Sequence, residues 1–161
     1  MSLLDTERAL RSLRKTPVIL HSFLKDVDQE RAMTATDGPD GWSVLEALCH
    51  LNDFAQIFAG RIDTMLATDH PTFALVDHLA LVVDNRYSEQ NFEAVWGQYL
   101  ERRRALVALL VTLEPAAWLR TGVTGGGVET TVLEIAYNVF IHDITHAEQM
   151  IRSLGLATDL I

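Results

Sequence analysis

The chain has 161 residues, 48% of them hydrophobic and 22% charged, which favours one globular domain spanning residues 1–161. It contains 13 Lys and Arg against 22 Asp and Glu, so its formal net charge is −9. Phosphate backbones and anionic lipid surfaces attract basic proteins, so this charge argues against nucleic acid or a membrane surface as the main partner.

The first predicted helix covers residues 5–27 and carries a proline near its middle. Because proline lacks a backbone N–H, Pro17 either bends this helix or restarts it, with Thr16 as the N-cap of the second part. Residues 36–41 are rich in Gly, Pro and Asp, so we expect a loop there.

The second predicted helix covers residues 43–67 and begins with a capping pattern. Ser43 and Glu46 are spaced so that each side chain can accept a hydrogen bond from the other residue's backbone N–H. Residues 68–87 then form a linker that is long for a compact bundle. We expect this linker to cross over the bundle, to be functional, or to hold a short helix.

Two more helices are predicted over residues 88–113 and 131–154. Thr131 and Glu134 repeat the capping pattern, and Gly155 is well placed to end the last helix. Few segments alternate polar and apolar residues, so strand content is expected to be near zero. Four long amphipathic helices therefore predict an all-α four-helix bundle.

Three histidines are candidates for chemistry. His142 and His146 lie about 40° apart and one turn removed on a helix, at the edge of its apolar stripe. His50 has a similar place on the second helix. A buried imidazole without a partner costs about 1–3 kcal/mol, so these rings need partners. A shared metal ion would supply one, and ordinary structural hydrogen bonds are the alternative that the residues alone leave open.

The histidines belong to two stretches, residues 42–53 and 142–151, with the patterns Trp-Ser-x-x-Glu-x-x-x-His and His-x-x-x-His. With residues 14–17 ahead of an apolar helix, they resemble the DinB family along essentially the whole chain. The resemblance implies a bundle in which a long crossover between helices two and three makes helices two and four neighbours. It also implies one metal ion held by His50, His142 and His146.

Three imidazole nitrogens suit zinc or nickel, with iron and cobalt as alternatives. Three protein ligands also leave coordination positions open for water or substrate. The resemblance implies a metal-dependent enzyme that acts on a small molecule, as a hydrolase or as an S-transferase using a low-molecular-weight thiol. The alternatives are a non-catalytic metal-binding or stress-response protein and a plain interaction bundle whose histidines are structural.

Two carboxylates lie near the candidate ligands. Asp53 lies within about 60° of His50 on the helix and is the best candidate for a general base or for orienting a ligand. Its alternative is a solvated surface carboxylate. Asp143 lies about 100° from His142, where it can make an orienting or a structural hydrogen bond.

The remaining polar and aromatic candidates are predicted to be structural. Cys49 points away from the ion and is expected to be a packed core thiol. Trp42 is interpreted as a hydrophobic staple, with a roof over the pocket as the alternative. Three further histidines lack such partners and are predicted not to be ligands: His21, His70 and His78.

Two runs in the second half of the chain carry no predicted function. Residues 102–104 are three arginines spread around a helix, which indicates a solvated face. Residues 125–127 are three glycines without the Lys-Ser/Thr of a phosphate loop, which indicates a flexible turn.

Location and assembly are the last expectations. The single Cys49 fits a reducing compartment, and neither a signal peptide nor a run of roughly 18 apolar residues is found, so we expect a cytoplasmic protein. The resemblance implies a homodimer.

Overall fold

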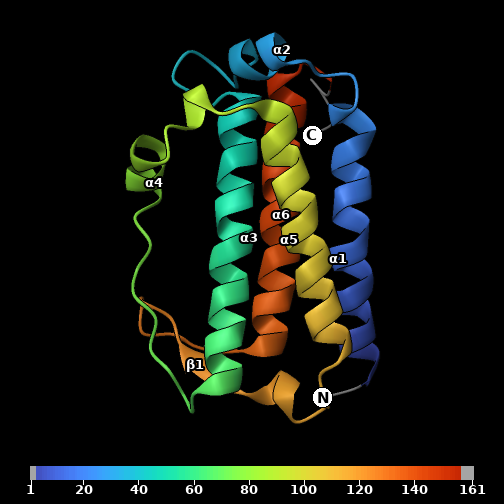
Figure 1. The fold of residues 1–161 in the computed structure, drawn as a ribbon, viewed down its shortest axis with the longest axis vertical. Coiled ribbons are helices and arrows are strands. Elements are labelled where there is room, and N and C mark those ends of the chain that lie inside the picture. The colour runs from blue at the N-terminus through green and yellow to red at the C-terminus, as the bar shows by residue number, and fades with distance from the viewer. Residues whose placement is uncertain (1–2, 157–161) are drawn as a thin grey trace.

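The computed structural model describes residues 3–156, and its long helices form the predicted all-α four-helix bundle (Figure 1). These helices are α1 (Leu3–Leu24), α3 (Val44–Ala67), α5 (Phe92–Val111) and α6 (Val132–Ser153). Short elements lie in the connections: α2 (Gln29–Thr34), α4 (His78–Asp84), η1 (Tyr87–Glu89), η2 (Ala117–Leu119), β1 (Thr121–Val123) and β2 (Glu129–Thr131).

Capping boxes fix the starts of α3 and α6, as predicted. The Ser43 N–H donates to Glu46 Oε2 at 2.8 Å, and the Glu46 N–H donates to Ser43 Oγ at 3.2 Å. Thr131 and Glu134 make the same reciprocal pair at 2.7 and 3.2 Å. Each box satisfies two N–H groups that the first turn leaves unpaired. At the end of α6, Gly155 has φ +69°, the left-handed conformation expected there.

The structure removes one alternative for Pro17 and corrects the start of one helix. Helix α1 runs through Pro17 as one element, so the chain does not restart there, and the Thr16 hydroxyl donates to a distant carboxylate instead of capping a helix. Helix α5 begins at Phe92 rather than at residue 88, because η1 occupies the expected first turn and Asn91 supplies the N-cap.

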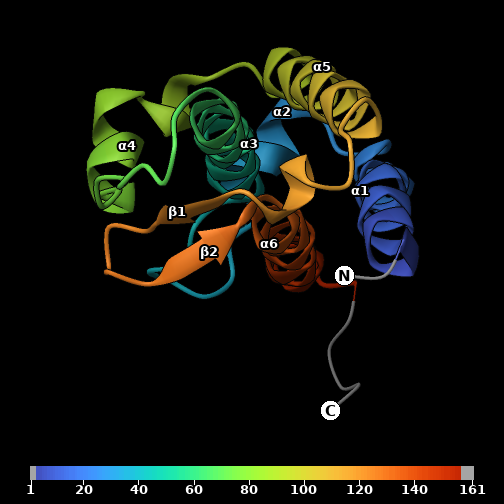
Figure 2. The ribbon, with the colours of Figure 1, turned by 90° about the horizontal axis from the view of Figure 1, so that it is seen from below.

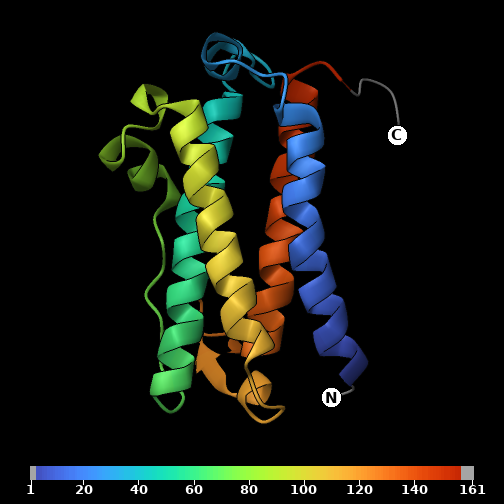
Figure 3. The same ribbon diagram turned by 45° about the vertical axis from the view of Figure 1, so that its right-hand side comes forward.

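The four long helices form two pairs of parallel neighbours, and these pairs explain the topology (Figure 3). Helices α3 and α5 run in the same direction and pack side by side, so the chain must return along the bundle between them. That return is the predicted crossover, and it carries α4 along the outside of α3 (Figure 2). Helices α1 and α6 form the other parallel pair. Helix α3 therefore packs on both α5 and α6, which confirms that helices two and four of the sequence analysis are neighbours.

The small hairpin at the other end of the bundle was not predicted. Strands β1 and β2 pair antiparallel, with Gly122 opposite Thr130, and the glycine run at 125–127 forms their turn. Gly127 has φ +79°, which glycine adopts without a steric penalty. The hairpin also anchors the start of the crossover, because the Phe73 N–H donates to Val123 O at 2.8 Å.

The core consists of two buried apolar clusters to which all four long helices contribute. One cluster contains Leu20, Leu45, Tyr99 and Met150, and the other contains Leu13, Ile62, Leu110 and Ile135. Fully burying such a side chain contributes about 1.5–3 kcal/mol, so these clusters fix the spacing of α3 and α6. Among residues 3–156, no helix combines the length and hydropathy needed to cross a bilayer.

Candidate metal centre

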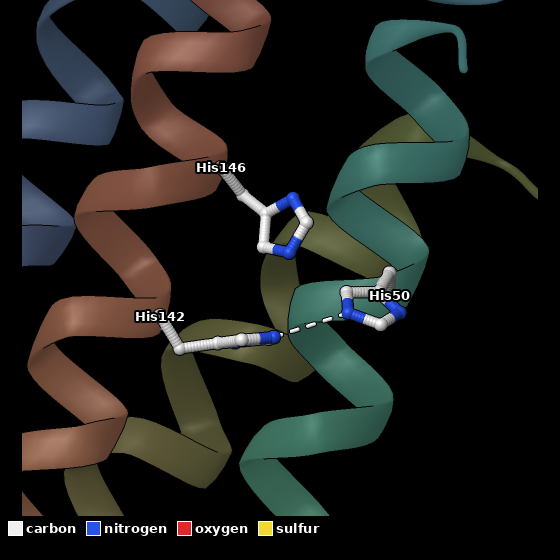
Figure 4. Close-up of side chains that lie close together, drawn as sticks. All are labelled: His50, His142 and His146. Atoms are coloured by element: carbon white, nitrogen blue, oxygen red, sulfur yellow. Dashed lines mark hydrogen bonds between the residues drawn. The ribbon is translucent and has the colours of Figure 1, made fainter. Parts of the chain in front are cut away.

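Three histidine rings meet where α3 faces α6 (Figure 4). His50 comes from the second turn of α3, and His142 and His146 come from successive turns of α6. Their ring centroids are 4.6 to 5.0 Å apart, and the Nε2 atoms of His50 and His142 are 3.0 Å apart. One nitrogen from each ring lies within 4.8 Å of the other two. Nitrogens that bind one ion at about 2.0–2.1 Å are roughly 2.9–3.4 Å apart, so one pair is already at ligand spacing.

Within residues 3–156, the converging nitrogens have no hydrogen-bond partners other than each other. His146 Nδ1 donates to Gln149 Oε1 at 2.8 Å, which puts the proton on Nδ1 and the lone pair on Nε2. Of the buried side-chain atoms described, His50 Nδ1 is among the few with no hydrogen-bond partner. Among the described residues, His142 is therefore the only hydrogen-bond partner of the His50 ring nitrogens. This donor set fits a transition metal ion.

The electrostatics keep the rings neutral. Burial, with smaller contributions from His146, His142 and His78, lowers the pKa of His50 to about 3. Burial also lowers the pKa of His142 to about 4, with a smaller effect from His146. The pKa of His146 is lowered by burial too, although its hydrogen bond to Gln149 opposes this. Since a metal binds the unprotonated ring, all three imidazoles are ready to bind one at neutral pH.

Aromatic side chains surround the rings on the cavity side. The Trp42 ring centroid is 5.0 Å from that of His50, and Phe54 is 4.4 Å from His50 and 4.8 Å from His142. A cavity of about 530 Å³ is lined by His50 and His146 and has both aromatic residues in its wall. Trp42 thus lines the pocket, and its interpretations as a hydrophobic staple and as a roof both stay predictions. The cavity has the size of a small-molecule site.

The sequence profile of the DinB superfamily matches residues 12–150. The chain belongs to the DinB superfamily. Among solved structures, YfiT from Bacillus subtilis is described as a probable metal-dependent hydrolase with an unusual four-helix bundle topology. It superposes with a TM-score of 0.83 at 19% sequence identity, over 98% of this chain and 91% of YfiT.

A second solved structure of the same fold is the mycothiol-dependent maleylpyruvate isomerase. It superposes with a TM-score of 0.76 at 14% identity, over 90% of this chain and 60% of the isomerase. No curated protein matches the sequence. At these identities the two likenesses show that this DinB protein shares a fold with both structures.

Asp53, the predicted base, lies outside the histidine cavity. Its Oδ2 accepts hydrogen bonds from Tyr87 Oη and Asn85 Nδ2, both at 2.7 Å. It lines a different cavity, between α3, α5 and the segment that follows α4. The i to i+3 spacing from His50 placed it near the ligands in sequence, but the crossover brings it other partners.

The run of arginines at 102–104 is not a solvated face, which corrects the prediction. Arg103 is 3% exposed, and its guanidinium donates to both oxygens of Asp143, at 2.5 and 3.1 Å. Thr16 also donates to Asp143, at 2.6 Å. Asp143 is thus a structural partner in the core of this DinB protein, one residue from His142. Only Arg104 of the three is exposed.

The predictions for the remaining cysteine and histidines have mixed outcomes. Cys49 is buried and donates to Tyr87 O at 3.8 Å, and burial raises the pKa of its thiol to about 12, so it is a core thiol as predicted. His21 and His70 lie away from the ligand cluster. His78 is also outside that cluster, but it lines the cavity from the first turn of α4. No pattern in the sequence pointed to that position, because the crossover determines it.

Proposed function

We propose that this DinB protein binds one divalent transition metal ion through His50, His142 and His146 and is a metal-dependent hydrolase of a small molecule. The observation that carries the proposal is the convergence of three neutral imidazoles, from two helices, beside a cavity. Zinc or nickel is the proposed ion, with iron and cobalt as alternatives, because neutral nitrogen donors suit all four.

The protein groups have distinct parts in this proposal. The three Nε2 atoms hold the ion, and Gln149 keeps the His146 proton on Nδ1 so that Nε2 stays free. Trp42 and Phe54 form the apolar part of the cavity wall beside the rings. When bound, the ion supplies Lewis acidity and lowers the pKa of a bound water toward neutrality. Three protein ligands leave room for that water and for a substrate atom.

A thiol S-transferase is the second candidate. It is favoured by the structural likeness to a mycothiol-dependent isomerase, and a thiolate is a good ligand for these metals. The hydrolase is preferred because the likeness to YfiT extends over nearly the whole of both chains. Asp53 stays the predicted base, although its bonds to Tyr87 and Asn85 do not favour that role. The homodimer and the cytoplasmic location stay predictions.

The test compares turnover before and after metal removal. Protein loaded in turn with zinc, nickel, iron or cobalt is assayed on small esters, amides and epoxides, with and without glutathione or cysteine. A hydrolase turns over without thiol, and a transferase only with it. Activity should vanish on chelation and in His142→Ala, and persist in His21→Ala, where the exposed α1 residue serves as the matched control. Turnover that survives both chelation and His142→Ala would refute the proposal, and tight metal binding without turnover would favour the non-catalytic alternative.

A further inference from the structure

The wall of the histidine cavity contains aromatic rings and no basic side chain of the lysine or arginine type. Trp42 and Phe54 line it together with His78 and Gln149. Of the described residues in this wall, none is lysine or arginine, and Asp40 is the one acidic residue. The wall therefore offers a ligand apolar surface and one negative charge, and it offers an anionic group no counter-charge.

The carboxylate of Asp40 is available to a ligand. Asp40 is an exposed residue of the loop before α3, and within residues 3–156 it makes no hydrogen bond or ion pair. Arg152, near the end of α6, is held by Asp37 at 3.1 Å and by Glu148 at 3.3 Å. Its charge is thus already matched by two carboxylates, whereas the charge of Asp40 is not matched.

The start of α3, next to Trp42 in the chain, does not make the cavity a site for anions. A helix N-terminus attracts anions through its unpaired N–H groups. Here the side chains of Ser43 and Glu46 accept hydrogen bonds from two such groups, at 3.2 and 2.8 Å. The Glu46 carboxylate also brings a negative charge of its own to this position, so the helix end is already neutralised.

Positive charge from a bound metal ion would act at one place, the coordination positions that the three histidines leave open. Those positions take the reacting atom of a substrate. The part of the substrate remote from that atom lies against the wall, where the rings and Asp40 determine what fits. The face of an aromatic ring attracts a cation, and a carboxylate adds to this attraction.

We propose that the histidine cavity binds its substrate through a cationic apolar group, such as an alkylammonium, that lies against Trp42 and Phe54 and near Asp40. We rely on the proposed function only for which end of the substrate reacts. An alkylammonium fits this wall because it carries apolar surface for the rings and a charge for the carboxylate. At 530 Å³ the cavity accepts such a group together with a small acyl unit. Substrates with a carboxylate or phosphate at the remote end should be poor ones.

The experiment compares three probes of similar shape and different charge by calorimetry: benzyltrimethylammonium, benzyl methyl sulfone and phenylmethanesulfonate. None of them has an N–H that could donate to an imidazole. Chelator-treated and zinc-loaded protein are both titrated at low ionic strength, where charges are least screened. We expect benzyltrimethylammonium to bind with a Kd below about 10 mM and about fivefold more tightly than the neutral sulfone, with the sulfonate weakest. Equal Kd values for the cation and the sulfone in either form, or tightest binding of the sulfonate, would overturn the proposal.

Two variants locate the charge that makes the preference. Asp40→Asn should weaken the binding of benzyltrimethylammonium about threefold or more and leave that of the sulfone unchanged. Asp26→Asn is the matched control, because it removes an exposed carboxylate that does not line the cavity. Both residues are exposed and lie in turns outside the helices, so both variants should fold. Equal losses in the two variants would assign the preference to the net charge of the protein and contradict the proposal.

This proposal and the proposed function fail in different ways. If the histidines hold no metal, zinc does not bind, but the order of the three probes in chelator-treated protein stays as expected. If the wall does not select cations, that order is lost in a protein that still binds zinc through its histidines.

Discussion

Two groups of buried polar side chains lie one residue apart on α6 and differ in how they are satisfied. The Arg103 and Asp143 pair contains both charges, and Thr16 adds a hydrogen bond. The histidine cluster contains only neutral rings of one kind, and His50 Nδ1 has no partner. In the first group each charge meets its counter-charge, and Arg103 Nε is left without a hydrogen-bond partner. The second group has no charge of its own and presents lone pairs that only a donor or a cation from outside can use. Buried polar groups of this second kind indicate a site rather than a support.

The two groups separate because of helix geometry. His142 and Asp143 are consecutive, so their side chains leave α6 about 100° apart. His142 faces α3, and Asp143 faces the residues that α1 and α5 supply. The ion pair joins three helices at the level of the histidines, and we infer that it helps to set the rotation of α6.

The largest expected effect comes from breaking the buried ion pair of Arg103 and Asp143. Asp143→Ala leaves the Arg103 charge buried and unpaired, so the free energy of unfolding should fall by about 3–5 kcal/mol. Urea unfolding of the metal-free protein measures this. Arg104→Ala, on the exposed face of α5, should change the same quantity by about 0.5 kcal/mol or less. A loss below about 1 kcal/mol in Asp143→Ala would mean that the pair does not support the bundle.

A smaller effect is expected from acid, and it probes the histidine cluster. His50 and His142 have lowered pKa values in the folded protein, near 3 and 4. Between those values and about 6.5, the unfolded chain binds more protons than the folded protein does. The contribution of the two neutral rings to the free energy of unfolding is therefore present above pH 6.5 and is lost as pH falls. For each group, the free energy of unfolding changes by up to about 1.4 kcal/mol per pH unit. Unfolding of metal-free protein at pH 7, 6 and 5 measures it, and an unchanged slope in His142→Gln would contradict the explanation.

The smallest effect on stability is expected from His142→Ala in metal-free protein. The ring is half-buried, and its nitrogen contacts only His50, so the free energy of unfolding should change by about 1 kcal/mol or less. A small loss here and a large loss in Asp143→Ala would show that the ion pair stabilises the bundle and that the histidine cluster does not. A loss as large as that of Asp143→Ala would show that the histidines are structural.

The sequence predicted the features that depend on local patterns. The two capping boxes set where α3 and α6 begin, and the i to i+4 spacing of His142 and His146 placed both rings on one face. The apolar periodicity of the four long segments predicted the helical bundle. What the resemblance added was the crossover that makes α3 and α6 neighbours, which no local pattern contains.

The features that were missed depend on contacts between distant segments. Arg103 was read as a surface residue because its partner, Asp143, is 40 positions away. The partners of Asp53 and the position of His78 come from the crossover, whose path is set by packing rather than by periodicity. Helix α2 and the hairpin were missed because six-residue and three-residue elements carry little signal.

The central claim is that His50, His142 and His146 hold one ion, and a zinc titration tests it most directly. Metal-free wild-type protein and two variants, His142→Ala and His78→Ala, compete for zinc with a chromophoric chelator. We expect one ion per wild-type chain, and in His142→Ala a loss of affinity beyond the roughly 10–100-fold caused by removing a residue that only supports a ligand. His78→Ala changes a neighbouring residue of the same cavity and should bind zinc nearly as wild type does. Full occupancy in His142→Ala, or an equal loss in His78→Ala, would contradict the claim.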